Sequence, residues 1–247
     1  MNYPAAPWFV RLKPAPRAKM RLYCFPYAGG GVPVFRTWPD GLSASIEVWA
    51  AHLPGRGSRS REAPVRHMLP LVQTLVRQLP ADSNQRPFAF FGHSLGARVG
   101  FEVARSLRRQ GKPLPAQLFV SACPAPQLPS GRPIHMLPKA AFLAELQRRN
   151  GIPQEVLAHP ELLELLLPML RADFMVIETA VYRREPPLNF PITAFGGIED
   201  PIVSRGALEA WREQTSGPFN MVFFTGDHFF LRTAEDQLLQ AINTTAM

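Results

Sequence analysis

Apolar runs of strand length alternate along most of the chain with segments of helical spacing. Helical spacing is clearest at residues 65–79 and 95–109, where apolar side chains recur every three or four positions. Such alternation predicts right-handed crossovers and a mainly parallel sheet flanked by helices, with a site at the C-terminal ends of the strands. We therefore expect an α/β fold, with strands at residues 20–25, 46–51, 88–91, 117–122, 190–195 and 219–224.

The alternation stops after the strand that ends at residue 122, and the distance to the next strand is too long for a simple crossover. We expect a helix at residues 139–149, a short one at 154–158 and a Leu-rich one at 161–182 with a kink at Pro168. We predict one domain, residues 1–247, with a helical lid insertion at residues 125–187. A plain second helical layer, which meets no acyl chain, is the alternative for this segment.

Composition is that of an ordinary globular protein, since 46% of the 247 residues are apolar and 19% are charged. No apolar run approaches the length of a membrane span, and residues 1–16 lack the hydrophobic stretch of a secretory signal. The proline-rich residues 1–17 are expected to lie extended on the surface. Cys24 and Cys123 sit in apolar runs without metal-binding spacing, which favours buried thiols in a reducing cytoplasm. We therefore expect a cytoplasmic protein that works away from membranes.

The net charge is +8, from 27 Lys and Arg residues against 19 Asp and Glu residues. A basic surface favours acidic partners, and nucleic acid is the usual first suspect. The arginines are dispersed, however, and no recognised nucleic-acid motif accompanies them. The pattern therefore argues against a nucleic-acid binder. It leaves two explanations open, an acidic protein partner and no partner at all.

The main chemical signal lies in residues 88–97. An apolar run stops at Gly92 and a helix begins within one residue of Ser94, so Gly92-His93-Ser94-Leu95-Gly96 forms Gly-x-Ser-x-Gly at a strand-to-helix junction. The glycines allow a cramped turn that lifts the Ser94 hydroxyl out, and the N–H of Leu95 points at whatever that hydroxyl attacks. We interpret Ser94 as a nucleophile. The alternative is a helix N-cap serine between two packing glycines.

A glycine-rich loop follows the first predicted strand, at residues 26–31. Three consecutive glycines permit close approach of the backbone to a ligand and unusual φ values. In hydrolases with a Gly-x-Ser-x-Gly turn, such a loop supplies the second N–H of the oxyanion hole. A phosphate-binding loop competes with this interpretation, but the segment lacks the Lys-Ser/Thr ending of a P-loop and does not spell Gly-x-Gly-x-x-Gly. The oxyanion role is therefore favoured.

A serine nucleophile needs a base to take its proton and an acid to hold that base in one tautomer. Of six histidines, only His228 directly follows a late buried strand, and we expect it to be the base. The acid should lie between Ser94 and His228 in the chain. The late strand ending near residue 195 is followed by Glu199 and Asp200, and we choose Asp200 because the proline after it favours a turn. Asp227 competes, but a sequence neighbour of His228 is badly placed to reach the far ring nitrogen.

Five motifs together resemble those of type II thioesterases, the stand-alone α/β-hydrolases of nonribosomal peptide and polyketide synthesis. The resemblance runs essentially the full length of the chain, and five motifs in the right order are far more specific than any one. The motifs are Phe25-Pro26-Tyr27-Ala28-Gly29-Gly30, Leu53-Pro54-Gly55-Arg56-Gly57, Gly92-His93-Ser94-Leu95-Gly96, Gly197-Ile198-Glu199-Asp200-Pro201 and His228-Phe229-Phe230-Leu231.

The resemblance implies an α/β-hydrolase fold and hydrolysis of acyl or aminoacyl thioesters from the phosphopantetheine arms of carrier domains, which clears misprimed or stalled units. It implies Ser94, Asp200 and His228 as the catalytic triad, and the backbone N–H groups of Ala28 and Leu95 as the oxyanion hole. We expect no metal and no cofactor. The expected partners are acyl or peptidyl carrier domains, and the protein is expected to be a monomer.

Two positions depart from the family pattern. Tyr27 stands where relatives often carry histidine, and Asp227 stands where a glycine commonly precedes the catalytic histidine. Neither departure touches the implied triad. The competing functions are a medium-chain fatty acyl thioesterase or general carboxylesterase of the same fold, and a non-catalytic helper that binds carrier domains. The presence of Ser94, Asp200 and His228 argues against the last of these.

Overall fold

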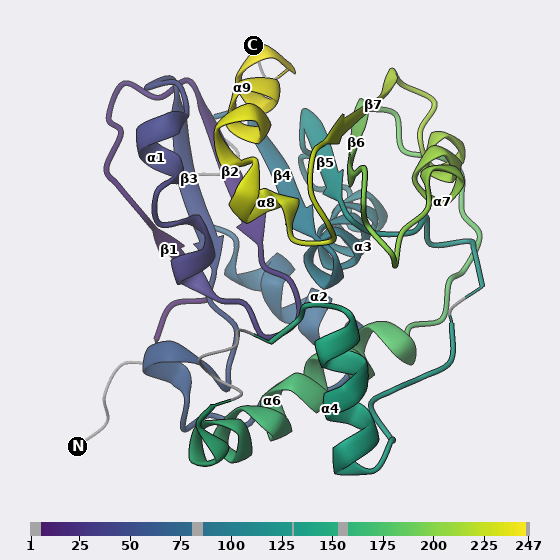
Figure 1. Ribbon diagram of the computed structural model, residues 1–247. Helices are drawn as coiled ribbons and strands as arrows, with labels where there is room; N and C mark the ends of the chain where they lie inside the picture. The colour runs from purple at the N-terminus through teal and green to yellow at the C-terminus, as the bar shows by residue number, and fades with distance from the viewer. Residues whose placement is uncertain (1–5, 81–85, 130, 153–157, 246–247) are drawn as a thin grey trace.

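A computed structural model describes residues 6–80, 86–129, 131–152 and 158–245 of the chain. These residues form one seven-stranded sheet in the order β1-β3-β2-β4-β5-β6-β7, in which β1 is antiparallel to β3 and the other pairs are parallel (Figure 1). The predicted α/β fold with a mainly parallel sheet is confirmed. The strands are β1 (Phe9–Arg11), β2 (Met20–Phe25), β3 (Ile46–Ala51), β4 (Phe88–His93), β5 (Gln117–Ser121), β6 (Ile192–Gly197) and β7 (Phe219–Phe224).

Helices cover both faces of the sheet, which explains why β2, β4, β5 and β6 are buried along their whole length. Alternate residues of each strand face different layers: Tyr23 and Phe25 pack in one apolar cluster, whereas Leu22 and Cys24 pack in the other. One face carries α2 (Met68–Gln78), α3 (Leu95–Arg109), α7 (Arg205–Glu209) and the 3-10 helix η4 (Ala210–Gln214). The other carries η1 (Val32–Phe35), α1 (Trp38–Gly41), α8 (Phe230–Thr233) and α9 (Glu235–Thr245).

The prediction that residues 1–17 lie on the surface is wrong for part of this segment. Residues Phe9–Arg11 form β1, an edge strand on β3, and Phe9 is buried. Its ring packs edge-to-face against Tyr23 and Phe25. Three residues are too short for a clear periodic pattern, and the unpaired edge of β3 determines this structure rather than local sequence preference.

The segment between β5 and β6 carries α4 (Lys139–Arg148) and α6 (Pro160–Glu178), which lie together below the sheet in Figure 1. They pack around an apolar cluster of their own, separate from the two clusters of the sheet. The short helix expected at residues 154–158 falls almost entirely outside the described residues. The members of the separate cluster are Ile134, Phe142, Leu146, Ile152, Leu163, Leu167, Met169 and Leu170.

No described helix is both long enough and apolar enough to span a membrane.

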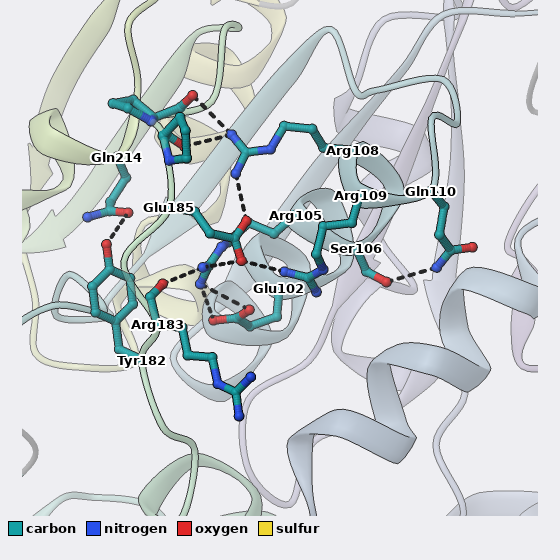
Figure 2. Close-up of polar contacts among 12 residues, drawn as sticks. Glu102, Arg105, Ser106, Arg108, Arg109, Gln110, Tyr182, Arg183, Glu185 and Gln214 are labelled. Carbon is teal, nitrogen blue, oxygen red and sulfur yellow. Dashed lines mark hydrogen bonds and ion pairs between the residues drawn. The ribbon is translucent and has the colours of Figure 1, made fainter.

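The chain leading back from α6 to β6 is attached to α3 by an arginine cluster. Figure 2 shows the Glu185 carboxylate between the guanidinium groups of Arg105, Arg108 and Arg109, at 2.6, 2.7 and 2.7 Å. Arg105 also donates to the backbone carbonyl of Arg183. Because α3 itself packs on the sheet, these contacts fix the C-terminal end of the insertion relative to the sheet.

Candidate active site

Ser94 occupies a strained turn between β4 and α3. Its φ of 53° and ψ of −116° fall where non-glycine residues are rarely found. Its N–H donates to the carbonyl of Ser121 at 2.7 Å, which ties the turn to the end of β5. The local structure is therefore the strand-to-helix elbow predicted from the sequence. In the described residues, the Ser94 side chain makes no capping hydrogen bond to α3, which argues against the alternative of a helix N-cap serine.

Both glycines of the elbow are required by close backbone contacts. A Cβ at Gly92 would lie 2.2 Å from the carbonyl oxygen of Gly96, and a Cβ at Gly96 would lie 2.0 Å from that of Phe25. Neither contact can be relieved by a side-chain rotation, because the opposing atoms belong to the backbone. The elbow therefore packs directly against the end of β2, where the glycine-rich loop begins.

Asp200 and His228 meet at the same edge of the sheet. Nδ1 of His228 lies 2.8 Å from Oδ2 of Asp200, and both side chains are buried. The other carboxylate oxygen, Oδ1, accepts the N–H groups of Ile202 at 2.8 Å and Val203 at 3.1 Å. Since a carboxylate only accepts, Nδ1 of His228 carries a proton, and in the neutral ring the lone pair is therefore on Nε2.

The loops of Asp200 and His228 touch through their backbones. A Cβ at Gly197 would lie 2.3 Å from the carbonyl oxygen of Asp227, so only glycine permits this approach. The N–H of Glu199 donates to the carbonyl of Gly226 at 3.0 Å. The rival carboxylates are placed differently: Asp227 accepts the N–H of Phe229 at 2.7 Å, and Glu199 is exposed. Of these three carboxylates, Asp200 is the one that contacts the ring of His228.

His93 joins the elbow to the histidine loop. Its Nε2 lies 2.8 Å from the carbonyl oxygen of His228, and its Nδ1 lies 2.9 Å from Oγ of Ser121. Burial, reinforced by the nearby His228, holds the pKa of His93 well below its usual value, so the ring is neutral. Because a carbonyl only accepts, Nε2 donates and Nδ1 accepts from Ser121. His93 therefore positions the chain at His228 rather than acting as a base.

The glycine-rich loop places Ala28 in a tight turn. The N–H of Gly30 donates to the carbonyl of Tyr27 at 2.9 Å, and Gly29 has the φ of 82° that the third position of a type II turn needs. In the described part of the chain, the N–H groups of Ala28 and Leu95 have no hydrogen-bond partner. Both are therefore available to a ligand oxygen.

Tyr27 connects this turn to the histidine loop. Its ring centroid lies 5.8 Å from that of His93 and 5.1 Å from that of Phe229. Its hydroxyl accepts a hydrogen bond from Arg232, whose guanidinium also lies over the rings of Tyr27 and Phe229. This departure from the family pattern is therefore accommodated by a neighbouring arginine.

Sequence reasoning missed a buried ion pair beside the glycine-rich loop. Arg56 belongs to one of the five motifs, but the motif does not indicate its partner, Asp173. The two side chains form a bidentate pair at 2.7 and 2.9 Å. Asp173 lies on the same buried face of α6 as Leu163, Leu167 and Leu170. A carboxylate on a buried helical face needs a cation or hydrogen-bond donors, so its position in the helical pattern could have indicated a buried partner.

The thiol of Cys123, just after the end of β5, is unreactive because it is buried. Burial raises the pKa of the Cys123 thiol to about 12, so the nucleophilic thiolate is not available at neutral pH. Within the described ranges, no group of three or more His, Cys, Asp or Glu side chains is arranged to hold a metal ion.

Comparison with known proteins assigns the chain to a family. The family model of the thioesterase domain matches residues 20–245. The chain belongs to the thioesterase family. It is therefore a thioester hydrolase, and the matched residues include every element of the sheet except β1.

Individual relatives agree with this assignment. Gramicidin S biosynthesis protein GrsT of Aneurinibacillus migulanus is 42% identical over 234 residues, which cover 94% of this chain and 91% of that protein. RedJ, a thioesterase of the prodiginine pathway in Streptomyces coelicolor, matches with a TM-score of 0.89 and 38% identity, over 98% of this chain and 96% of its own. The type II thioesterase BorB of the borrelidin cluster matches with a TM-score of 0.85 and 36% identity, over 98% of both chains. The resemblance to type II thioesterases found in the sequence is confirmed.

Proposed function

We propose that this thioesterase releases acyl or aminoacyl groups from the phosphopantetheine arms of carrier domains, with Ser94, His228 and Asp200 as its catalytic triad. The observation that carries the triad is the 2.8 Å contact between His228 and Asp200 on loops joined to the elbow. The hydrogen bond from His93 to the His228 carbonyl supports it, because it brings the histidine loop to the residue next to Ser94.

In the first half-reaction, Oγ of Ser94 attacks the thioester carbonyl carbon while Nε2 of His228 accepts the hydroxyl proton. Asp200 holds the Nδ1–H and stabilises the imidazolium that forms. When the tetrahedral intermediate collapses, the C–S bond breaks and the proton passes from Nε2 to the pantetheine sulfur. The carrier leaves with a free thiol, and the acyl group stays on Ser94 as an ester.

In the second half-reaction, water attacks the ester carbonyl and gives a proton to Nε2 of His228. Breakage of the ester C–O bond returns that proton to Oγ of Ser94, and the carboxylic acid departs. Each tetrahedral intermediate carries a negative oxygen, and the free N–H groups of Ala28 and Leu95 are the proposed donors to it. Losing one such donor typically slows turnover by about 10²- to 10³-fold.

The proposal also accounts for the charge and the insertion. Acidic carrier domains as partners fit a chain of net charge +8. The insertion at residues 125–187 is proposed to act as a lid over the acyl group, since its helices lie beside the loops of the site. We place the reaction in the cytoplasm, in keeping with two free buried cysteines.

A medium-chain fatty acyl thioesterase would share this fold and triad. The relatives compared above belong to the gramicidin S, prodiginine and borrelidin pathways, which favours peptide or polyketide carriers over fatty acid synthase. The distinction depends on the acyl carrier rather than on the catalytic residues, and it is therefore a question for substrate comparison.

One substrate panel tests the proposal. A single acyl group is presented on a carrier domain, on coenzyme A, on a fatty acid synthase carrier and as an oxygen ester, and kcat/KM is measured for each. We expect the highest value on the peptide or polyketide carrier, and a loss of several orders of magnitude in Ser94→Ala. Ser60→Ala, at an exposed serine, is the matched control. Near-normal turnover by a folded Ser94→Ala protein would contradict the triad, and a preference for the fatty acid synthase carrier would favour the alternative.

A further inference from the structure

The helical insertion contributes a buried carboxylate to the loop that carries Ala28. Asp173 lies on α6, and its side chain is 4% exposed. Its Oδ2 accepts the N–H of Gly29 at 2.8 Å, and the same carboxylate accepts both terminal nitrogens of Arg56. One side chain of the insertion therefore joins the loop after β2 to the loop after β3.

Arg56 holds the glycine-rich loop a second time. Its side chain is 8% exposed, and Nη1 donates to the carbonyl oxygen of Gly30 at 2.7 Å as well as to Asp173. The N–H of Gly29 and the C=O of Gly30 are thus both bound to the same ion pair. A bidentate pair of this kind fixes direction as well as distance, because the guanidinium and carboxylate are planar forks.

Close packing reinforces the charged contacts. A Cβ built on Gly29 would lie 2.6 Å from Cδ2 of Leu170, which stands one turn before Asp173 on α6. The turn therefore rests directly on one face of α6. A shift of α6 would displace the peptide plane that follows Ala28, because the Gly29 N–H belongs to that plane.

We infer that Asp173 is a positioning residue of the oxyanion hole: paired with Arg56, it holds the turn from Tyr27 to Gly30 so that the Ala28 N–H faces the carbonyl under attack. The inference rests on the proposed function of Ser94 and Ala28. Displacing the Ala28 N–H should slow turnover less than removing such a donor altogether. We therefore expect a loss of about 10- to 100-fold in kcat when Asp173 is changed.

Two variants separate positioning from folding. Asp173→Asn keeps the size of the side chain, but its NH2 group must face a donor: either Nη2 of Arg56, or the Gly29 N–H together with Nη1 of Arg56. Because a lone buried Arg56 would destabilise the fold, the double variant Arg56→Met with Asp173→Leu replaces the whole pair by apolar side chains, a change that folded proteins often tolerate. Asn150→Gly is the matched control, since it removes an exposed 2.8 Å hydrogen bond between the insertion and Asp227, and glycine tolerates the φ of 52° at this position.

The measurements are kcat and KM for a small acyl-pantetheine thioester, the melting temperature, and Ki for a trifluoromethyl ketone analogue, whose adduct with Ser94 places an oxyanion in the hole. We expect both Asp173 variants to lower kcat and to raise Ki by the same factor, with KM within about twofold. Asn150→Gly should leave kcat, KM and Ki unchanged. Unchanged kcat and Ki in the folded double variant, or a raised KM with unchanged kcat, would overturn the inference. Activity surviving in Ser94→Ala, measured in parallel, would instead overturn the proposed function.

Discussion

The two sides of the site are held in different ways. On the acid–histidine side, Asp200 accepts two N–H groups of its own turn, and Gly197 lets the histidine loop approach through the backbone. On the oxyanion side, the glycine-rich turn is held by Asp173, which belongs to the insertion between β5 and β6. The first arrangement is complete within neighbouring loops of the sheet, whereas the second needs a helix from elsewhere in the chain.

Because of this difference, substitutions in the two regions should affect different steps of the reaction. A change within the sheet loops should affect proton transfer and leave the oxyanion donors in place. A change in α6 should affect the oxyanion donors and leave the histidine and its acid in place. On the proposed function, the insertion is therefore more than a lid over the acyl group, because one of its side chains reaches the loop proposed to supply an oxyanion donor.

The largest expected effect comes from breaking the acid–histidine side. Asp200→Asn should lower kcat by about 10⁴-fold, because the amide favours the tautomer of His228 that lacks a basic Nε2. Ki for the trifluoromethyl ketone should rise in this variant as well, because formation of its adduct with Ser94 also needs His228 to accept the hydroxyl proton. The matched controls are Asp227→Asn and Glu199→Gln, neither of which contacts the ring of His228. If either control were more damaging than Asp200→Asn, the assignment of the acid would be wrong.

The acid–histidine side could be expected from the sequence because its signals are local. Gly-x-Ser-x-Gly sits at a strand end, Asp200 and His228 each follow a strand, and parallel strands bring such ends to one edge. These patterns span a few residues each and depend on the backbone geometry of strands and turns. The same locality let the strands at residues 20–25, 46–51 and 219–224 be predicted with the bounds observed.

On the oxyanion side, the sequence indicated the glycine-rich loop but not the ion pair that holds it. Asp173 meets Gly29 across 144 positions and Arg56 across 117, and its partner is chosen by how the insertion packs on the sheet. No periodic pattern encodes that docking. Edge strand β1 was missed for a related reason, since its structure depends on a free edge of β3 and not on its own three residues. Contacts of this kind can be identified only in the folded structure.

A smaller effect concerns His93, which links the elbow to the histidine loop. Burial lowers its pKa in the folded state, so below the unfolded pKa of about 6.5 the unfolded chain binds a proton that the folded chain does not. Stability should therefore fall as pH drops below about 6.5, by up to about 1.4 kcal/mol per pH unit from this group. His93→Gln keeps a donor for the His228 carbonyl and lacks the titration.

The test is urea unfolding between about pH 5 and pH 8. At pH 8 the variant should be less stable than the wild type by about 1 kcal/mol, because the substitution removes the contact between His93 and Ser121. This difference in the free energy of unfolding should become smaller at acid pH, where the wild type loses stability. Parallel pH dependence in the two proteins would mean that His93 does not carry this part of the acid sensitivity.

The smallest expected effect concerns the exposed edge of the insertion, where an ion pair of the same chemistry as Arg56–Asp173 lies in water. Arg148 contacts Glu145 at 2.9 Å but is 58% exposed, so the pair contributes little to stability. We expect Arg148 to act on the approach of an acidic carrier. Arg148→Glu should raise KM for the carrier-bound substrate about two- to fivefold at low salt, an effect that salt should screen. Hydrolysis of a small pantetheine thioester should not change, because Arg148 lies outside the proposed triad and the Arg56–Asp173 pair.

Arg77→Glu is the matched control, since Arg77 is an exposed arginine in the last turn of α2, at the opposite end of the strands. Equal losses with both substrates would indicate a disturbed insertion, and equal effects of the two reversals would indicate attraction by net charge rather than a carrier surface on α4.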